Sequence, residues 1–192
     1  MTKSDEGLRR AVVIVAVLNL AYFGVEFSMA EIIGSVSLLA DSIDFLEDAS
    51  MNFLIAVALG WTVARRAVAG KMLAGILLIP GLATLWMAWQ KFSLPIPPEA
   101  IPLSLTGGGA LTVNLSCALL LTKYRHHAGS LTRAAFLSAR NDAFANIAII
   151  AAGFFTAYTT SAWPDLIVGL GIAVMNADAA REVWEAARAE GR

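Results

Sequence analysis

Long apolar runs dominate the chain, and short polar connectors separate them. A helix needs about 20 mostly apolar residues to cross a membrane. Six stretches meet this requirement, at residues 11–31, 36–60, 71–90, 100–121, 131–157 and 164–186. The pattern predicts an all-α, polytopic membrane protein, a bundle of six transmembrane helices. It also predicts that residues 1–192 form a single transmembrane domain with no soluble domain.

The connectors favour the same division. Gly34 lies in a very short connector, which predicts a tight antiparallel hairpin of the first two helices. The segment SLPIPPEAIP separates the third helix from the fourth, because its prolines break a helix. Pro164 is expected in the first turn of the last helix, where its missing N–H is not needed.

Basic residues fall almost entirely on one side of a six-helix arrangement. Lys91 lies on the other side, and Arg140 lies inside a span. The residues of the larger set are Lys3, Arg9, Arg10, Arg65, Arg66, Lys71, Lys123, Arg125, Arg133, Arg181, Arg188 and Arg192. Since basic residues concentrate in cytoplasmic loops, both termini are predicted to be cytoplasmic.

Composition narrows the possible partners. Only 15% of the residues are charged and 58% are hydrophobic, too little charge to cover a soluble domain. The net charge of −1 and the lack of basic clusters argue against nucleic acid. Cys117 is the single cysteine, so the chain cannot form an internal disulfide. The expected partner is the lipid bilayer, with the protein a multi-pass component of the cell membrane, the inner membrane in a bacterium.

The second predicted helix carries carboxylates inside the membrane. A charged Asp at the centre of a span costs about 2.5–3.5 kcal/mol on insertion scales. Asp44 and Asp48 are spaced i, i+4, and Asp41 precedes them by three residues on the same stripe. A solvated polar face would explain this stripe on a soluble helix but not in a span. Three carboxylates on one stripe repel one another unless protons or a cation neutralise them.

The fifth predicted helix carries a second polar face. Ser138, Asp142 and Asn146 are spaced i, i+4 and i+8, and Asn141 lies beside them. A polar contact that only holds two helices together would explain serine or asparagine, but not aspartates on both helices.

Antiparallel packing of these two helices would set Asp44 against Asp142 and Asp48 against Ser138. A helix rises about 1.5 Å per residue, and counting from each end places Asp48 and Asp142 near the middle of the membrane. Such a group of oxygen ligands suits a divalent cation, so these four residues are the predicted metal site. Burial and repulsion favour protonated carboxyl groups in the empty site, and metal binding requires deprotonated ones. The site therefore predicts proton-coupled exchange of a metal ion.

These residues resemble the cation diffusion facilitator family of divalent-metal/proton antiporters over nearly the whole chain. The resemblance rests on GSVSLLADSIDFLEDAS from Gly34, RNDAFANIAIIAAG in the fifth helix, PDLIVGLGIAV in the sixth, and Asn19, Phe23 and Glu26 in the first. The family's membrane site is a pair of acid-or-His-x-x-x-Asp motifs. Asp44 and Asp48 match the first motif, and Asp142 matches the aspartate of the second. Ser138 stands where the family usually has His or Asp.

The resemblance implies a homodimer that alternates between inward- and outward-facing states and exports metal from the cytoplasm in exchange for protons. Zinc is the leading expectation because it is the family's commonest substrate. The oxygen-rich ligands also suit Mn²⁺ or Fe²⁺, and Co²⁺ and Cd²⁺ are further candidates. No cofactor beyond the transported ion and no enzyme activity are expected. The family's usual C-terminal cytoplasmic domain is expected to be absent, which would leave dimerisation to the membrane helices.

Several alternatives stay open from the sequence. Either Ser138 is a weak ligand, or Asn141 or a water completes the metal's shell, or Asp41 turns in. Glu26 is expected to carry protons, hydrogen-bond a neighbour or bind the metal. His126 and His127 fit an ordinary basic loop better than a metal-collecting one.

Two other functions compete with transport. One is a metal-binding sensor or scaffold that moves no ion. The other is an intramembrane aspartyl protease, which is disfavoured because the chain lacks a G-x-G-D arrangement in its fifth and sixth helices.

Overall fold

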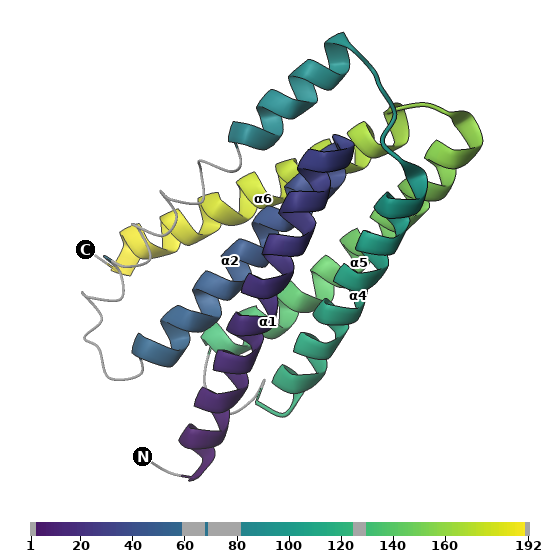
Figure 1. Ribbon diagram of the computed structural model, residues 1–192. Helices are drawn as coiled ribbons and strands as arrows, with labels where there is room; N and C mark the ends of the chain where they lie inside the picture. The colour runs from purple at the N-terminus through teal and green to yellow at the C-terminus, as the bar shows by residue number, and fades with distance from the viewer. Residues whose placement is uncertain (1–2, 59–67, 69–81, 125–129, 191–192) are drawn as a thin grey trace.

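A computed structural model describes residues 3–58, 68, 82–124 and 130–190, and almost all of these residues are helical (Figure 1). The helices are α1 (Lys3–Ile33), α2 (Val36–Ala58), α4 (Ala100–Thr122), α5 (Ser130–Thr159) and α6 (Trp163–Glu190). A further helical segment covers residues 82–93. The described ranges contain no strand, so the predicted all-α class is confirmed.

Most helix boundaries agree with the apolar runs. The proline-rich segment 95–99 is not helical, and α6 begins at Trp163, directly before Pro164. The largest difference is α1, which begins at Lys3, roughly two turns before the apolar run. Hydropathy marks only the part of a helix that suits lipid, whereas backbone hydrogen bonds continue into polar sequence. Of the predicted third helix, residues 71–81 lie outside the described residues.

Three described helices are long and apolar enough to cross a membrane, namely Glu6–Ile33, Ala100–Thr122 and Ser138–Thr159. The apolar part of α6, Trp163–Ala177, is shorter. The sequence of α2 carries Asp41, Asp44, Glu47 and Asp48, which lower its hydropathy. This helix nevertheless lies in the middle of the bundle, packed against α1, α5 and α6 and, less extensively, α4.

A tight turn at Gly34 and Ser35 joins α1 and α2 into an antiparallel hairpin. Gly34 has a positive φ of 65°, a conformation that glycine adopts without a steric penalty. Ser35 caps α2, because its Oγ accepts a hydrogen bond from the backbone N–H of Leu38 at 3.2 Å. Farther from the turn, the rings of Tyr22 and Phe45 lie 5.1 Å apart between centroids. The predicted hairpin is therefore present, and its register is fixed.

A buried polar network lies at the turn end of this hairpin. Asp165, in the first turn of α6, accepts hydrogen bonds from the Oγ atoms of Ser35 and Ser37, each at 2.6 Å. It also accepts the backbone N–H groups of Val36 at 2.9 Å and Ser37 at 3.2 Å, donors that have no partner inside α2. Lys91 forms an ion pair with Asp165 at 3.2 Å and donates to the carbonyl of Gly34. The network joins three parts of the bundle at one corner.

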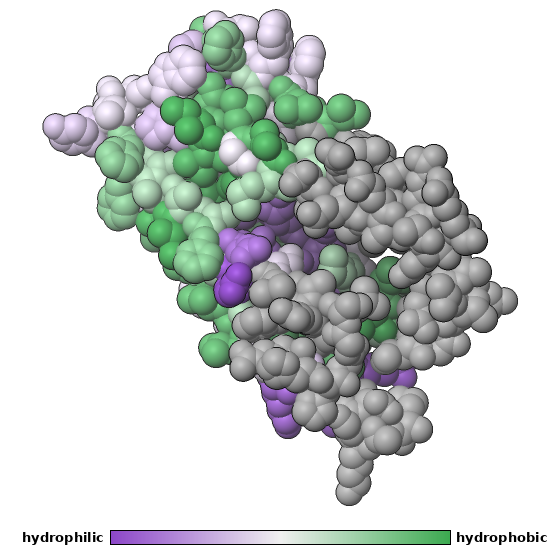
Figure 2. Space-filling view, turned by 180° about the vertical axis from the view of Figure 1, so that it is seen from behind, coloured by the Kyte–Doolittle hydropathy of each residue, from purple (hydrophilic) through white to green (hydrophobic). Residues whose placement is uncertain are grey.

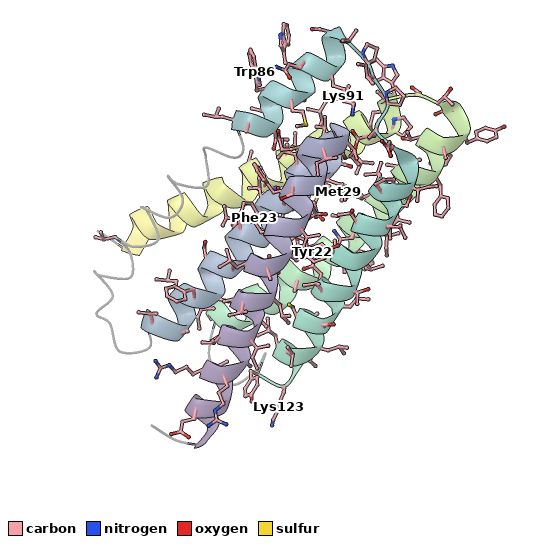
Figure 3. All side chains as sticks on the ribbon, in the orientation of Figure 1. Tyr22, Phe23, Met29, Trp86, Lys91 and Lys123 are labelled. Carbon is pink, nitrogen blue, oxygen red and sulfur yellow. The ribbon has the colours of Figure 1, made fainter. Side chains whose placement is uncertain are left out.

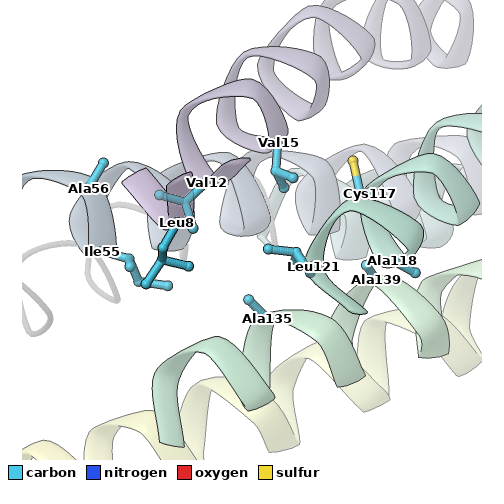
Figure 4. Packing of buried hydrophobic residues seen from close by; sticks show 10 residues of the cluster. All are labelled: Leu8, Val12, Val15, Ile55, Ala56, Cys117, Ala118, Leu121, Ala135 and Ala139. Atoms are coloured by element: carbon cyan, nitrogen blue, oxygen red, sulfur yellow. The ribbon is translucent and has the colours of Figure 1, made fainter. Parts of the chain in front are cut away.

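Two apolar clusters lie on either side of a polar middle. The first contains Leu8, Val12, Val15, Ile55, Ala56, Cys117, Ala118, Leu121, Ala135 and Ala139 (Figure 4). The second contains Ala30, Leu38, Leu39, Ala40, Leu103, Ile149 and Ile172. In each of α1, α2, α4 and α5, buried polar residues fall between the positions that belong to the two clusters.

The outer surface suits a bilayer. On the face seen in Figure 2, hydrophobic side chains gather over much of the described surface, with hydrophilic patches among them. Lys123 lies at the end where α1 begins, and Lys91 lies toward the opposite end (Figure 3). This separation agrees with the predicted division of the basic residues. The cytoplasmic placement of the termini stays a prediction.

Candidate metal centre

Two hydrogen bonds fix how α2 faces α5. Ser138 Oγ donates to Asp48 Oδ1 at 2.8 Å. About two turns away, Asn146 Nδ2 donates to Asp41 Oδ2. The two helices run in opposite directions, so residue numbers increase along α5 as they decrease along α2. The predicted contact between Asp48 and Ser138 is present.

Asp44 and Asp142 lie between these two contacts. The antiparallel register places them opposite each other. Asp48 is almost fully buried at 2% exposure, whereas Asp44, Asp142 and Ser138 are partly buried. All four predicted metal residues therefore meet along one α2–α5 seam near the centre of the bundle.

The acids are spread along this seam rather than gathered at one point. Within the described ranges, no three acidic, His or Cys side chains come close enough together to hold a metal ion. The predicted binding of one metal ion by these residues stays a prediction. Asp48 turns to Ser138, and Asp142, one turn along α5 from Ser138, lies near both Asp44 and Asp48. Successive turns of a helix are about 5.4 Å apart, so side-chain rotation must bring the carboxylates around one ion.

Two buried amides, on α2 and α1, have oxygen atoms without a hydrogen-bond partner among the described residues. Asn52 follows Asp48 by one turn and donates its Nδ2 to the carbonyl oxygen of Asp48 at 2.9 Å. Asn19 donates its Nδ2 to the carbonyl oxygen of Val15 at 3.0 Å. Oδ1 of each amide is buried without a hydrogen-bond partner. These oxygens are available as further ligands or as acceptors for a metal-bound water.

The structure separates the remaining candidates. Asn141 is exposed and accepts a hydrogen bond from Arg140 at 3.2 Å, so it does not reach the seam. Asp41 is fully buried and faces Asn146. Glu26 is fully buried on α1. The pair His126 and His127 lies outside the described residues.

Asn52 and Asn114 were not singled out as site residues from the sequence. Asn52 continues the spacing Asp44, Asp48 by a further four residues, which was the available signal. Asn114 donates its Nδ2 to Asn146 Oδ1 at 2.9 Å, and it carries no signal beyond being a buried polar residue in an apolar helix.

The chemistry of this seam suits a divalent cation. Carboxylate and amide oxygens are hard ligands, and acids buried close together need a positive charge to balance them. Among the described residues these acids form no ion pair with Lys or Arg. The ion pair that the described residues contain joins Lys91 to Asp165, at the corner near the Gly34 turn.

Comparison with known families now decides the assignment. A family model described as the cation efflux transmembrane domain matches residues 12–189. The chain belongs to this family. The match confirms the resemblance to cation diffusion facilitators, and it runs through every described helix of the bundle. No curated protein matches the chain.

Membership defines the general activity of this cation efflux protein. It is a multi-pass membrane protein and a divalent-cation efflux transporter. Members of the family are transporters rather than enzymes, which agrees with the expectation from the sequence.

Proposed function

We propose that this cation efflux protein exports a divalent transition metal from the cytoplasm in exchange for protons, with zinc as the leading substrate and Mn²⁺, Fe²⁺, Co²⁺ or Cd²⁺ as alternatives. The observation that carries the proposal is the hydrogen bond from Ser138 to Asp48. It joins the two family motifs across the α2–α5 seam, with Asp44 and Asp142 in the next positions.

In this proposal Asp44, Asp48 and Asp142 bind the metal, and Ser138 orients Asp48 or serves as a weak ligand. Asp41 is not a ligand, because its carboxylate is engaged by Asn146 two turns away from the Asp48–Ser138 contact. Asn141 is not a ligand either, because it is exposed beside Arg140.

Proton exchange follows from the chemistry of the ligands. Carboxyl groups must be deprotonated to bind the metal, so the arriving ion displaces protons and the departing ion is replaced by them. A divalent charge also relieves the repulsion between the three aspartates. The same residues therefore serve both substrates at different times.

Alternating access is supported by the two apolar clusters around the polar middle. The first lies between the seam and the end where α1 begins, and the second lies toward the Gly34 turn. An ion can reach the seam from one side only if the helices of one cluster separate while those of the other stay packed. Family membership supports operation as a homodimer, with contacts between membrane helices.

Transport by purified protein in lipid vesicles tests the proposal. Vesicles with a pH gradient are supplied in turn with Zn²⁺, Cd²⁺, Mn²⁺, Fe²⁺ and Co²⁺, and uptake of metal and movement of protons are followed together. Asp48→Asn and Asp142→Asn should abolish transport. Glu31→Gln, which changes an exposed carboxylate on α1, should retain it.

Each outcome has a definite meaning. Transport that survives both aspartate substitutions would remove the seam as the metal site. Metal transport that is insensitive to the pH gradient would remove proton antiport. Metal binding without movement of any ion would favour the sensor function.

A further inference from the structure

A second pair of buried carboxyl groups lies between α1 and α2, apart from the metal seam. Glu26 and Asp41 are both fully buried, at 0% exposure. They lie at nearly equal distances in sequence from the Gly34 turn, so the hairpin register sets them opposite each other. The contact between Tyr22 and Phe45, one turn farther from the Gly34 turn, follows the same register. The two carboxyl groups therefore face each other across the buried α1–α2 interface.

No hydrogen-bond donor from the described residues explains why the Glu26 and Asp41 carboxyl groups lie against each other. Both carboxyl oxygens of Glu26 and Oδ1 of Asp41 are buried without a donor from the described residues. An ionised carboxylate has only acceptors, so two ionised groups cannot bond to each other. One proton held between them supplies the missing donor and removes one of two buried negative charges.

Two asparagines orient Asp41 for this role. Asn114 Nδ2 donates to Asn146 Oδ1 at 2.9 Å, so the other end of the Asn146 amide, Nδ2, faces Asp41. Asn146 Nδ2 donates to Asp41 Oδ2, which is therefore an acceptor and carries no proton. The other oxygen of Asp41, Oδ1, is left for the contact with Glu26. The arrangement links α4, α5, α2 and α1 through fully or almost fully buried groups.

The charged and titratable neighbours of the pair are almost all acidic. Tyr22 faces it from α1, Asp44 and Asp48 lie along α2, and Asp142 lies on α5. The described residues of α4 and α6 place no charged group among these neighbours, and no Lys, Arg or His forms an ion pair with either carboxyl group in the described ranges. A proton is thus the neutralising ion that the surroundings favour.

We propose that Glu26 and Asp41 form a proton-binding site, separate from the metal ligands, in which the two carboxyl groups share one proton. When a divalent cation arrives at Asp44, Asp48 and Asp142, its charge lowers the affinity of the pair for that proton, which passes to water and leaves a second carboxylate behind. Proton loading of the pair weakens metal binding by the same factor, because coupling between two binding sites is reciprocal. This coupling rests on the proposed transport function, whereas the shared proton does not.

Infrared spectroscopy of the full-length protein in metal-free vesicles tests the shared proton directly. At neutral pH we expect the carbonyl stretch of a protonated carboxyl group. It should persist in the triple variant Asp44→Asn/Asp48→Asn/Asp142→Asn, which removes the seam carboxyl groups that can also hold protons, and disappear when Glu26→Gln is added to that triple variant. Asp41→Asn should remove it as well, because an amide can donate to Glu26 and leave it ionised. Glu31→Gln, an exposed carboxylate on the same helix, should leave the band unchanged.

The band also gives the results that would overturn the proposal. Its absence from the triple variant, or its persistence when either Glu26→Gln or Asp41→Asn is added to the triple variant, would show that the pair holds no proton. Asp41→Asn keeps the acceptor for Asn146, so it provides a test even if Glu26→Gln does not fold.

Proton release on metal binding tests the coupling. Zn²⁺ is added to the protein in weakly buffered detergent solution with a soluble pH indicator. Glu26→Gln should release about one proton fewer per bound metal ion than the unmodified protein or Glu31→Gln. Unchanged release in Glu26→Gln would overturn the coupling. No metal binding by the unmodified protein would instead contradict the proposed function, and the infrared band would still decide the shared proton.

Discussion

Ser138 is the residue at which this chain departs from the usual family motif. The structure gives its hydroxyl group a partner, Asp48, at 2.8 Å. A neutral oxygen at this position leaves the metal with carboxylates as its main ligands. A histidine would add a nitrogen ligand of the kind that zinc binds at about 2.0–2.1 Å.

We therefore expect Ser138→His to raise the rate of zinc transport relative to manganese transport. The ratio of initial rates in vesicles measures this effect. Asn141→His introduces the same side chain on α5 at an exposed position and should leave the ratio unchanged. An unaltered ranking of metals in Ser138→His would show that residue 138 does not touch the ion.

Asn146 is a single buried residue that links two other buried polar side chains by hydrogen bonds. It receives a hydrogen bond from Asn114 and donates one to Asp41. Asn146→Ala would leave both neighbours buried without these partners. Each unsatisfied buried group costs about 1–3 kcal/mol.

Asn146→Ala should consequently lower the thermal unfolding temperature of the purified protein in detergent. Asn141→Ala, on the same helix but exposed, should have little effect. Equal unfolding temperatures for the two variants would mean that the buried amide network does not stabilise the bundle.

At the scale of helices, small residues allow α6 to approach α2 closely. A Cβ atom at Gly169 would lie 2.7 Å from the backbone of Val36 and Ser37. This backbone belongs to the start of α2, which the Asp165 network also holds in place. Gly171, two residues farther along α6, has no neighbour within 4 Å of such a Cβ atom.

Gly169→Ala should destabilise the protein by about 1–3 kcal/mol, because the extra methyl group forces two backbones apart. In Gly171→Ala the higher helix propensity of alanine, up to about 1 kcal/mol, is not opposed by a clash. Thermal unfolding of both variants in one detergent compares them. A Gly169→Ala variant as stable as Gly171→Ala would contradict the close approach of α6 and α2.

At the scale of the whole molecule, one buried ion pair joins segments that are distant in sequence. Lys91 lies in the last turn of the helical segment 82–93, and Asp165 lies in the first turn of α6. Together they bind the turn between α1 and α2. Both side chains are nearly or fully buried, at 6% and 0% exposure. Removing one partner leaves the other as an uncompensated buried charge.

Asp165→Asn should therefore destabilise the protein by about 3–5 kcal/mol. The double variant Asp165→Asn/Lys91→Met should recover part of this loss, because it removes the unpaired charge as well. Lys123→Met, at an exposed lysine near the opposite end, is the matched control. Unfolding of Asp165→Asn at the temperature of the unmodified protein would show that the corner does not hold the bundle together.

The positions of the helices followed largely from the sequence. Apolar length and proline placement depend on residues that are close together in the chain, and the physical constraint of the bilayer acts on each helix separately. The same local spacing showed that Asp44, Asp48, Asp142 and Ser138 lie on matching helix faces. The polar ends of helices, such as the first two turns of α1, carry no apolar run that would predict them from the sequence.

Only the tertiary structure decided which polar groups meet. Hairpin register pairs Glu26 with Asp41, helix packing brings Asn114 to Asn146, and the corner network brings Asp165 to Lys91. Each of these partners lies on a different helix, and the sequence of one helix does not determine its rotation against another. The sequence by itself therefore determined a membrane bundle with a carboxylate seam. The packing of the helices decided that Asn141 lies outside the seam and that Asp41 meets Asn146 two turns away from the Asp48–Ser138 contact.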